Sequence, residues 1–231
     1  MKRWGGFFLM GLGFLLWYAG GRSGNSAYVN LGIASLILGI VLLSLFYDEN
    51  TGDSSPLCSP YCDFLERLLR DANPRGKPVV IPPYENLPEG GILFPPRDNH
   101  PIGLGRLDRN GVLLQDGSLL VSPPPGWGVV KMATENAGDL SGVGVGYASS
   151  AVLAALNTLG AGGGEVFELE DSVEVYVRYS CAPSIFDPAV GAVLVSVALG
   201  ARSLYSVESV EHRNDHLRIE LRPLGGIERW L

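Results

Sequence analysis

The chain has 231 residues, of which 46% are hydrophobic and only 18% are charged, and its formal net charge is −7. Because average soluble domains carry about 25% charged residues, this composition excludes a disordered or fibrous protein. The acidic balance excludes a nucleic-acid binder, which needs a basic surface, and three cysteines are too few for a disulfide-rich scaffold.

Two segments near the N-terminus, residues 4–21 and 28–47, contain no charged residue. Each is long enough to cross a hydrocarbon core of about 30 Å as a helix that rises about 1.5 Å per residue. The linker over residues 22–27 is short, so the two helices are expected to run antiparallel. The sequence therefore predicts a transmembrane helical hairpin over residues 1–47.

The orientation of this hairpin depends on few charges. Lys2 and Arg3 precede the first segment, and basic residues favour the cytoplasmic side. We therefore expect a multi-pass protein of the cell membrane, with two helices and with both termini and the following domain in the cytoplasm. The alternative is a cleaved signal peptide ending near Ala27, which the second apolar segment disfavours.

Glycines recur in the two segments at a spacing of seven residues. A small residue at every seventh position places a stripe on one helix face, where two backbones can approach closely. The pattern predicts a tight seam within the hairpin or a self-association face. The alternative is that glycine is simply common in membrane helices. The glycines concerned are Gly6, Gly13, Gly20, Gly32 and Gly39.

A polar, turn-rich linker over residues 48–60 leads to a soluble domain over residues 61–231. Ser59 and Pro60 are typical of a helix start. The apolar residues that follow them share one face, which predicts a short amphipathic helix ending before the next proline.

The middle of the chain is rich in proline. Short strands are predicted at residues 79–81 and 92–94, each ended by a Pro-Pro pair that cannot continue a ladder. A hairpin is predicted around residues 115–117, and the run of prolines and glycines over residues 123–128 indicates a loop.

The C-terminal part alternates clearly between helical and strand patterns. The expected order is α-β-β-α-β-β, an α+β fold with helices packed on an antiparallel sheet. The second of these helices follows Asp187 and Pro188, is apolar on all sides, and must be covered by protein on all its faces. The elements are predicted at residues 147–159, 165–169, 173–179, 189–201, 204–211 and 217–222.

Cysteines offer the only candidates for reactive or metal-binding chemistry. Cys58 and Cys62 are separated by three residues, and with Cys181 they could supply part of a tetrahedral metal site. The alternative, which the absence of a second such pair favours, is that they are small semi-apolar residues or a redox-labile pair in a compartment that keeps them reduced. Cys181 lies between a strand and a helix start, where a thiol pKa can be lowered, but a structural thiol is the favoured interpretation.

Other motifs carry little chemical information. His212 and His216 flank the turn of the last hairpin, which is typical of a solvated turn. The glycines at 142, 144 and 146 precede a helix but have no phosphate-binding lysine. No catalytic motif is found, so we expect no enzyme activity, no metal and no cofactor.

Several blocks of the sequence resemble a family. The charge-free hairpin followed by VVIPP, GILFPP, GVLLQDGSLL and the closing block EVFELEDSVEVYVRYSCAPSIFDPAVGAVLVSVALGARSLYSVESVEHRNDHLRIELRPL is similar to an archaeal membrane-protein family of unknown function. This resemblance implies an N-terminal membrane hairpin and an α+β domain, and it assigns no functional residue. The predicted order of the C-terminal elements also resembles the small ligand-binding domains of the vinyl-reductase type, which are related to vesicle-tethering subunits.

Two functional hypotheses follow. The first is a membrane-anchored, non-enzymatic interaction or scaffold module at the cytoplasmic face, with the lipid bilayer and a protein partner or a second copy as partners and no nucleic acid. The second is a sensor for a small molecule or lipid, with a pocket between the two apolar helices and the sheet. The candidate ligand-binding residues of that pocket are Cys181, Pro183, Ser184 and Asp187.

Overall fold

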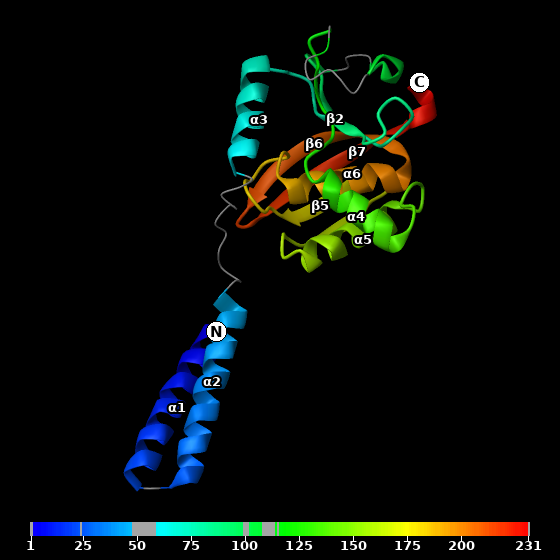
Figure 1. Cartoon of the computed structure of the whole chain (residues 1–231). Coiled ribbons are helices and arrows are strands. Elements are labelled where there is room, and N and C mark those ends of the chain that lie inside the picture. The colour runs from blue at the N-terminus through cyan, green and yellow to red at the C-terminus, as the bar shows by residue number, and fades with distance from the viewer. Residues whose placement is uncertain are drawn as a thin grey trace. The chain divides into compact units, whose positions relative to one another are not determined.

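The computed structural model (Figure 1) describes residues 2–23, 25–47, 59–98, 102–107, 114 and 116–230. The chain divides into two compact units, Met1–Thr51 and Gly52–Leu231.

The first unit is a pair of helices, α1 (Lys2–Ser23) and α2 (Ser26–Tyr47), that pack against each other. Glycines form their contact. A Cβ atom on Gly13 would lie 2.8 Å from the carbonyl oxygen of Gly32, one on Gly32 would lie 2.5 Å from the backbone nitrogen of Trp17, and one on Gly20 would lie 2.6 Å from that of Val29. Any side chain at these three glycines would collide with the backbone of the facing helix.

The remaining two glycines of the stripe belong to the same helices. Gly6 lies in α1 and Gly39 in α2, but the surroundings of both are outside the described residues. Of the five glycines in the stripe, Gly13, Gly20 and Gly32 therefore lie at the contact between the two helices.

The prediction that these two helices cross a membrane is wrong. Within the described ranges, no helix combines the length and the apolar character that a membrane span requires. The prediction counted charge-free length, and in α1 that count includes glycine, tyrosine and tryptophan, which add little to the free energy of transfer into lipid compared with leucine or isoleucine. The predicted multi-pass membrane localisation is contradicted by the same finding.

The second unit contains a seven-stranded sheet in which every pair of neighbouring strands is antiparallel, in the order β3-β2-β1-β6-β7-β5-β4. The predicted α+β class is confirmed for this unit. The strands are β1 (Val79–Ile81), β2 (Gly91–Phe94), β3 (Leu119–Val121), β4 (Gly164–Glu168), β5 (Val173–Arg178), β6 (Ser203–Arg213) and β7 (His216–Gly226).

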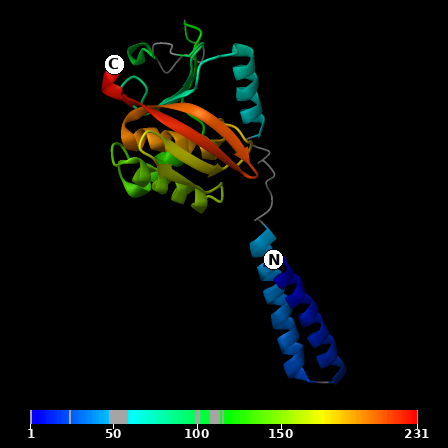
Figure 2. The same ribbon diagram turned by 180° about the vertical axis from the view of Figure 1, so that it is seen from behind.

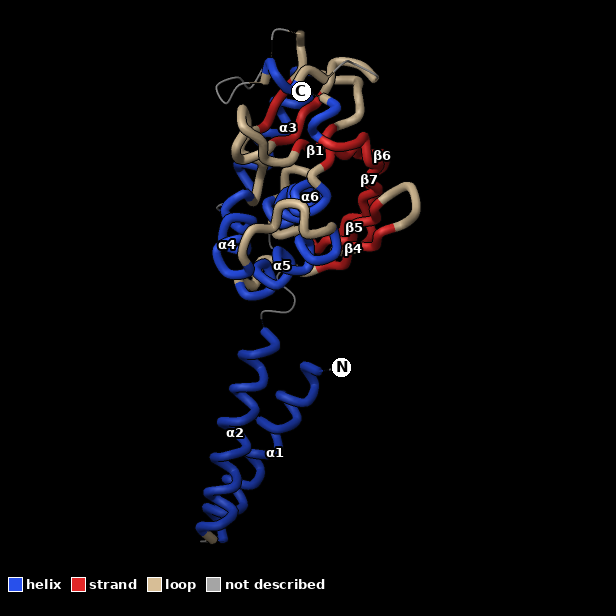
Figure 3. The backbone as a smooth tube through the Cα atoms, turned by 90° about the vertical axis from the view of Figure 1, so that its right-hand side faces the viewer, coloured by secondary structure: helices blue, strands red, loops and turns tan. Residues whose placement is uncertain are grey.

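Helices α5 (Val145–Thr158) and α6 (Pro188–Ala201) cover one face of this sheet, and α4 (Trp127–Ala137) packs against these two helices, as Figure 3 shows from the side. Helix α6 lies at the centre and is buried along nearly its whole length, because its run of valine, leucine and alanine has no polar face to turn toward water. As predicted, Asp187 is its N-cap, and Pro188 lies in its first turn. The C-terminal order α5-β4-β5-α6-β6-β7 is the predicted one.

Helix α4 was not predicted, because its sequence follows a proline-rich loop and has a mixed pattern. Two close backbone approaches join its start to α6. A Cβ atom on Gly191 would lie 2.3 Å from the carbonyl oxygen of Pro125, and Gly126, which has a φ of 77°, would place a Cβ against the carbonyl oxygen of Pro188. Glycine at both positions allows the loop before α4 to lie directly on α6.

Helix α3 (Ser59–Ala72) stands beside the β2 end of the sheet (Figure 1). Its one buried leucine, Leu65, joins a small apolar cluster with side chains of β2, β3 and the residue before the α6 cap, namely Ile92, Phe94, Leu119, Val121 and Phe186. Helix α3 is therefore held by one apolar stripe, and its other side, including Phe64 and Tyr61, is exposed.

The other face of the sheet differs along its length. At the β1–β3 end it is covered by the segments around η2 (Leu104–Arg106) and η3 (Ile227–Arg229). Along β5 and β7 none of the described helices covers this face, as seen from behind in Figure 2. Alternate residues there are polar, and Arg218 pairs with Glu174 at 2.6 Å and with Glu211 at 3.2 Å.

Candidate functional site

The segment between β5 and α6 is organised around the carboxylate of Asp187, which is fully buried. Its Oδ2 accepts hydrogen bonds within 3.2 Å from the backbone N–H groups of Ser180, Cys181 and Ala182. Its Oδ1 accepts the N–H groups of the first turn of α6, from Ala189 at 2.9 Å and from residue 190 at 3.4 Å. One carboxylate thus accepts hydrogen bonds both from the backbone N–H groups at the start of α6 and from those of the loop after β5.

Cys181 and Cys62 lie close to this carboxylate but in different chemical states. Cys181 is buried and disulfide-bonded. Cys62 is a free, buried thiol whose Sγ donates to the carbonyl oxygen of Phe186 at 3.5 Å. Burial, followed by the negative charges of Asp187 and Glu66, raises the pKa of the Cys62 thiol to about 11. The thiol is therefore protonated at neutral pH and is a poor nucleophile and metal ligand.

The metal site considered for Cys58, Cys62 and Cys181 is not assembled by the residues that the structure describes, since no group of three histidine, cysteine or acidic side chains in those ranges is placed to hold an ion. Cys58, its other candidate ligand, lies outside them. The thiol activation considered for Cys181 does not apply to a disulfide sulfur, which has no proton to lose.

A cavity of about 520 Å³ opens between α3, the segment that leads from α3 to β1, Phe94 of β2, and the loop before α6. Its floor is apolar, and Phe94 and Phe186 meet there with their ring centroids 5.4 Å apart. Glu66 and Arg70, one helical turn apart on α3, line it together with Ser184. The complete lining is Glu66, Leu69, Arg70, Asn73, Pro74, Gly76, Pro78, Phe94, Ser184, Ile185 and Phe186.

The four predicted ligand-binding residues separate in the structure. Ser184 lines the cavity, whereas Pro183 is exposed and is not among its lining residues. Asp187 and Cys181 are buried and do not line the cavity, and the hydrogen bond from the Cys181 N–H to the Asp187 carboxylate helps to hold the loop in place. The sequence analysis did not identify the residues of α3 that line the cavity. An amphipathic pattern predicts that one face of the helix is buried, but it does not show which part of the domain that face packs against.

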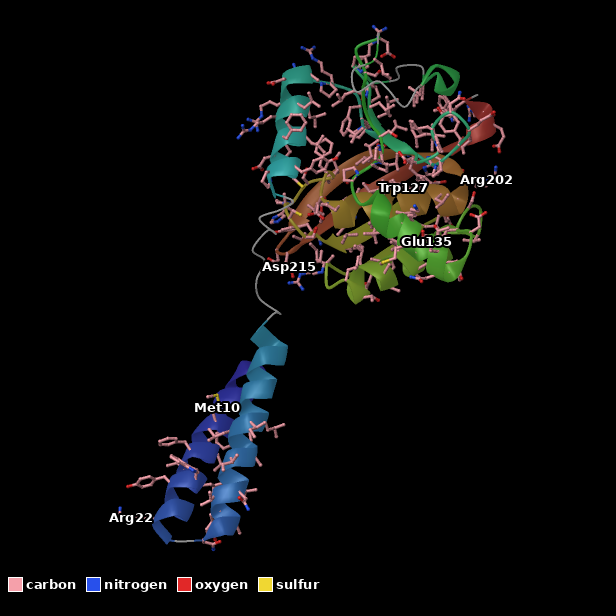
Figure 4. The ribbon with its side chains drawn as sticks, in the orientation of Figure 1. Met10, Arg22, Trp127, Glu135, Arg202 and Asp215 are labelled. Atoms are coloured by element: carbon pink, nitrogen blue, oxygen red, sulfur yellow. The ribbon has the colours of Figure 1, made fainter. Side chains whose placement is uncertain are left out.

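The two predicted turn histidines lie at the tip of the β6–β7 hairpin, which Asp215 marks in Figure 4. His212 Nε2 lies 3.2 Å from the hydroxyl of Tyr179, whereas His216 Nδ1 lies 2.6 Å from Asp215 Oδ1. The two imidazoles have different partners, which fits a role in fixing the turn.

Comparison with known proteins finds no matching family model, no similar curated protein and no similar solved structure. The resemblances to an archaeal membrane-protein family and to vinyl-reductase-type domains therefore stay predictions.

Proposed function

We propose that this protein is a binding module that takes a small amphipathic molecule in the cavity beside α3. The observation that carries the proposal is the open cavity of about 520 Å³ with an apolar floor and a polar rim. Pockets for small ligands measure about 300–1,000 Å³ and combine apolar walls with a few polar groups, and this cavity has both properties.

The lining indicates the chemistry of the ligand. Leu69, Phe94 and Phe186 provide an apolar floor for an aliphatic or aromatic body. Arg70 lies at the rim and has no ion-pair partner within the described part of the chain. We therefore infer a ligand with an apolar body and one anionic group, which the guanidinium of Arg70 can bind as a charge-assisted hydrogen-bond donor.

The groups beside the cavity favour binding over catalysis. Cys62 is a protonated thiol at neutral pH, since its pKa is raised to about 11. Both oxygens of Asp187 already accept hydrogen bonds from buried backbone N–H groups. A group that is saturated in this way can position a loop but is not available to exchange a proton with a substrate.

This proposal keeps the small-molecule or lipid sensor expected from the sequence but assigns its pocket to a different part of the domain. The space between α5, α6 and the sheet is filled by the largest apolar cluster of the unit. The cavity lies instead against α3, at the loop where the predicted residue Ser184 stands.

The proposal is tested on the full chain with anilinonaphthalene sulfonate, which has an aromatic body and one anionic group. Titration should show saturable fluorescence, and Ser184→Trp, which fills the cavity, should raise the dissociation constant at least about tenfold, a loss of about 1.4 kcal/mol. Arg70→Met should weaken binding in the same direction. Asn136→Trp, at an exposed position of α4, is the matched control and should change nothing.

Because this dye also binds partly folded chains, each variant is first compared with the parent by near-ultraviolet circular dichroism. Binding that is equal in Ser184→Trp, Asn136→Trp and the parent protein would overturn the proposed site.

A further inference from the structure

The outer edge of β4 presents backbone groups that no strand among the described residues pairs with. In the sheet order β4 has a single neighbour, β5. The backbone N–H of Arg178 donates to the carbonyl of Gly163 at 2.8 Å, and that of Leu169 donates to Ser172 at 2.9 Å. In an antiparallel pair, bonded positions alternate, so residues 163, 165, 167 and 169 bond toward β5. Gly164, Val166 and Glu168 therefore direct their N–H and C=O groups outward.

The α5 face beside this edge is uncharged in an otherwise acidic protein, whereas β4 itself carries the exposed Glu165 and Glu168. No charged residue occurs from Leu140 to Gly164, although the chain carries a net charge of −7. Several large apolar side chains are exposed there, and the exposed positions of α5 are otherwise small or neutral. The exposed apolar side chains near the edge are Val143, Tyr147, Leu159, Phe167 and Leu169.

We propose that the β4 edge and the α5 face beside it form the interface between two copies of this chain, related by a two-fold axis at Val166. Acidic copies repel each other over most of their surface, but the charge-free stretch from residue 140 to residue 164 lowers that repulsion where the two α5 helices would meet. The two β4 strands then pair antiparallel and double the seven-stranded sheet.

The register centred on Val166 fits both the hydrogen bonds and the charges. It sets Val166 opposite its own copy and Gly164 opposite Glu168, so all three outward-facing positions become bonded pairs. It also sets Glu165 opposite Phe167, so that no carboxylate directly faces another. The Glu168 carboxylate already accepts the N–H of Gly146 at 2.9 Å, which holds it toward α5.

The same register brings the helices of the two copies together. The side chain of Val166 packs toward the apolar cluster under α5 and α6, so the axis through this residue passes beside α5, which contacts β4 (Figure 3). Exposed positions of α5 include Ser150, Ala154 and Asn157. Side chains of this size allow two helices to approach closely.

The first test measures the mass of the full chain in solution by sedimentation equilibrium. The parent protein should be dimeric. Val166→Lys places two like charges opposite each other at the axis and should raise the dimer dissociation constant at least about tenfold. Ala154→Arg is a second disruption that leaves β4 unchanged, and Val210→Lys, at an exposed valine on β6, is the control that should stay dimeric.

The second test identifies the register. Val166→Cys places two thiols opposite each other at the axis, within the Cα separation of about 4.4–6.8 Å that a disulfide spans, so it should form a cross-linked dimer under mild oxidation. Phe167→Cys faces Glu165 and should cross-link much more slowly. A monomeric parent, a dimer that persists in folded Val166→Lys and Ala154→Arg, or equal cross-linking of the two cysteine variants would overturn the proposal. If the parent protein is monomeric, the candidate partner of the β4 edge would be a strand from another protein.

Discussion

Replacing Asp187 by alanine should destabilise the second unit more than any other removal of a single carboxylate. The carboxylate accepts five backbone N–H groups, three from the loop after β5 and two from the first turn of α6. Asp187 is fully buried, so water cannot take over these bonds without opening the loop. Alanine removes the acceptor and leaves all five donors in place.

The magnitude follows from those bonds. Loss of a helix N-cap costs about 1 kcal/mol, and each buried donor left without an acceptor costs about 1–3 kcal/mol. Using the lower value for the three loop donors, because they share one oxygen and are close together, gives a total of about 4 kcal/mol. Domains have a free energy of unfolding of about 5–15 kcal/mol, so the variant should fold but with a large part of its stability lost.

Hydrogen exchange measured by mass spectrometry separates this unit from the α1–α2 hairpin. The amides of α6 are buried and exchange only when the unit opens, so about 4 kcal/mol predicts roughly 10³-fold faster exchange in Asp187→Ala. Asp139→Ala is the control, since Asp139 accepts one exposed backbone N–H from Ser141 at 2.9 Å. If the α6 amides of the two variants exchange at the same rate, the stabilising role assigned to Asp187 is refuted.

Two further predictions concern packing and charge. Gly191→Ala should lower the free energy of unfolding by about 1–3 kcal/mol, because the new Cβ would lie 2.3 Å from the carbonyl oxygen of Pro125. Gly128→Ala in α4 should raise it by about 0.5–1 kcal/mol, because a Cβ there meets nothing within 4 Å. Urea denaturation measures both changes, and two shifts of the same sign would contradict this reasoning. The hydrogen bond from Lys77 holds the pKa of the Glu208 carboxyl below its usual value. This carboxylate therefore stabilises the fold above its unfolded pKa of about 4.3, and that contribution is lost as the pH falls through the folded pKa. Thermal melts should show Lys77→Met below the parent at neutral pH and the difference disappearing in acid, and a constant difference would argue against the ion pair.

Local patterns are sufficient to predict much of this protein. The dipeptide Asp187-Pro188 before an apolar run predicts a capped, fully buried helix, and α6 has that structure. Strict alternation over residues 173–178 predicts a strand with one buried face, and β5 alternates between buried and half-buried residues in the same phase. These predictions succeed because a helix cap and a strand face depend on neighbours within a few residues.

The transmembrane prediction shows where a local pattern misleads. Absence of charge over 18 or 20 residues does not measure hydropathy, and the described helices do not reach the character of a span. The glycine spacing in the same segments was informative for a different reason. Gly13 and Gly32 are small because two backbones meet there, and close packing of helices needs no bilayer.

Tertiary structure alone decides the features that carry the proposals. The strand order places β6, near the end of the chain, beside β1, and no periodicity in either segment encodes that choice. The cavity exists because Arg70 of α3, Phe94 of β2 and Ser184 of the α6 loop meet although they are far apart in the chain. Backbone periodicity is set by neighbours in sequence, but the position of a groove or a sheet edge is set by which buried faces pack together, and that depends on the whole chain at once.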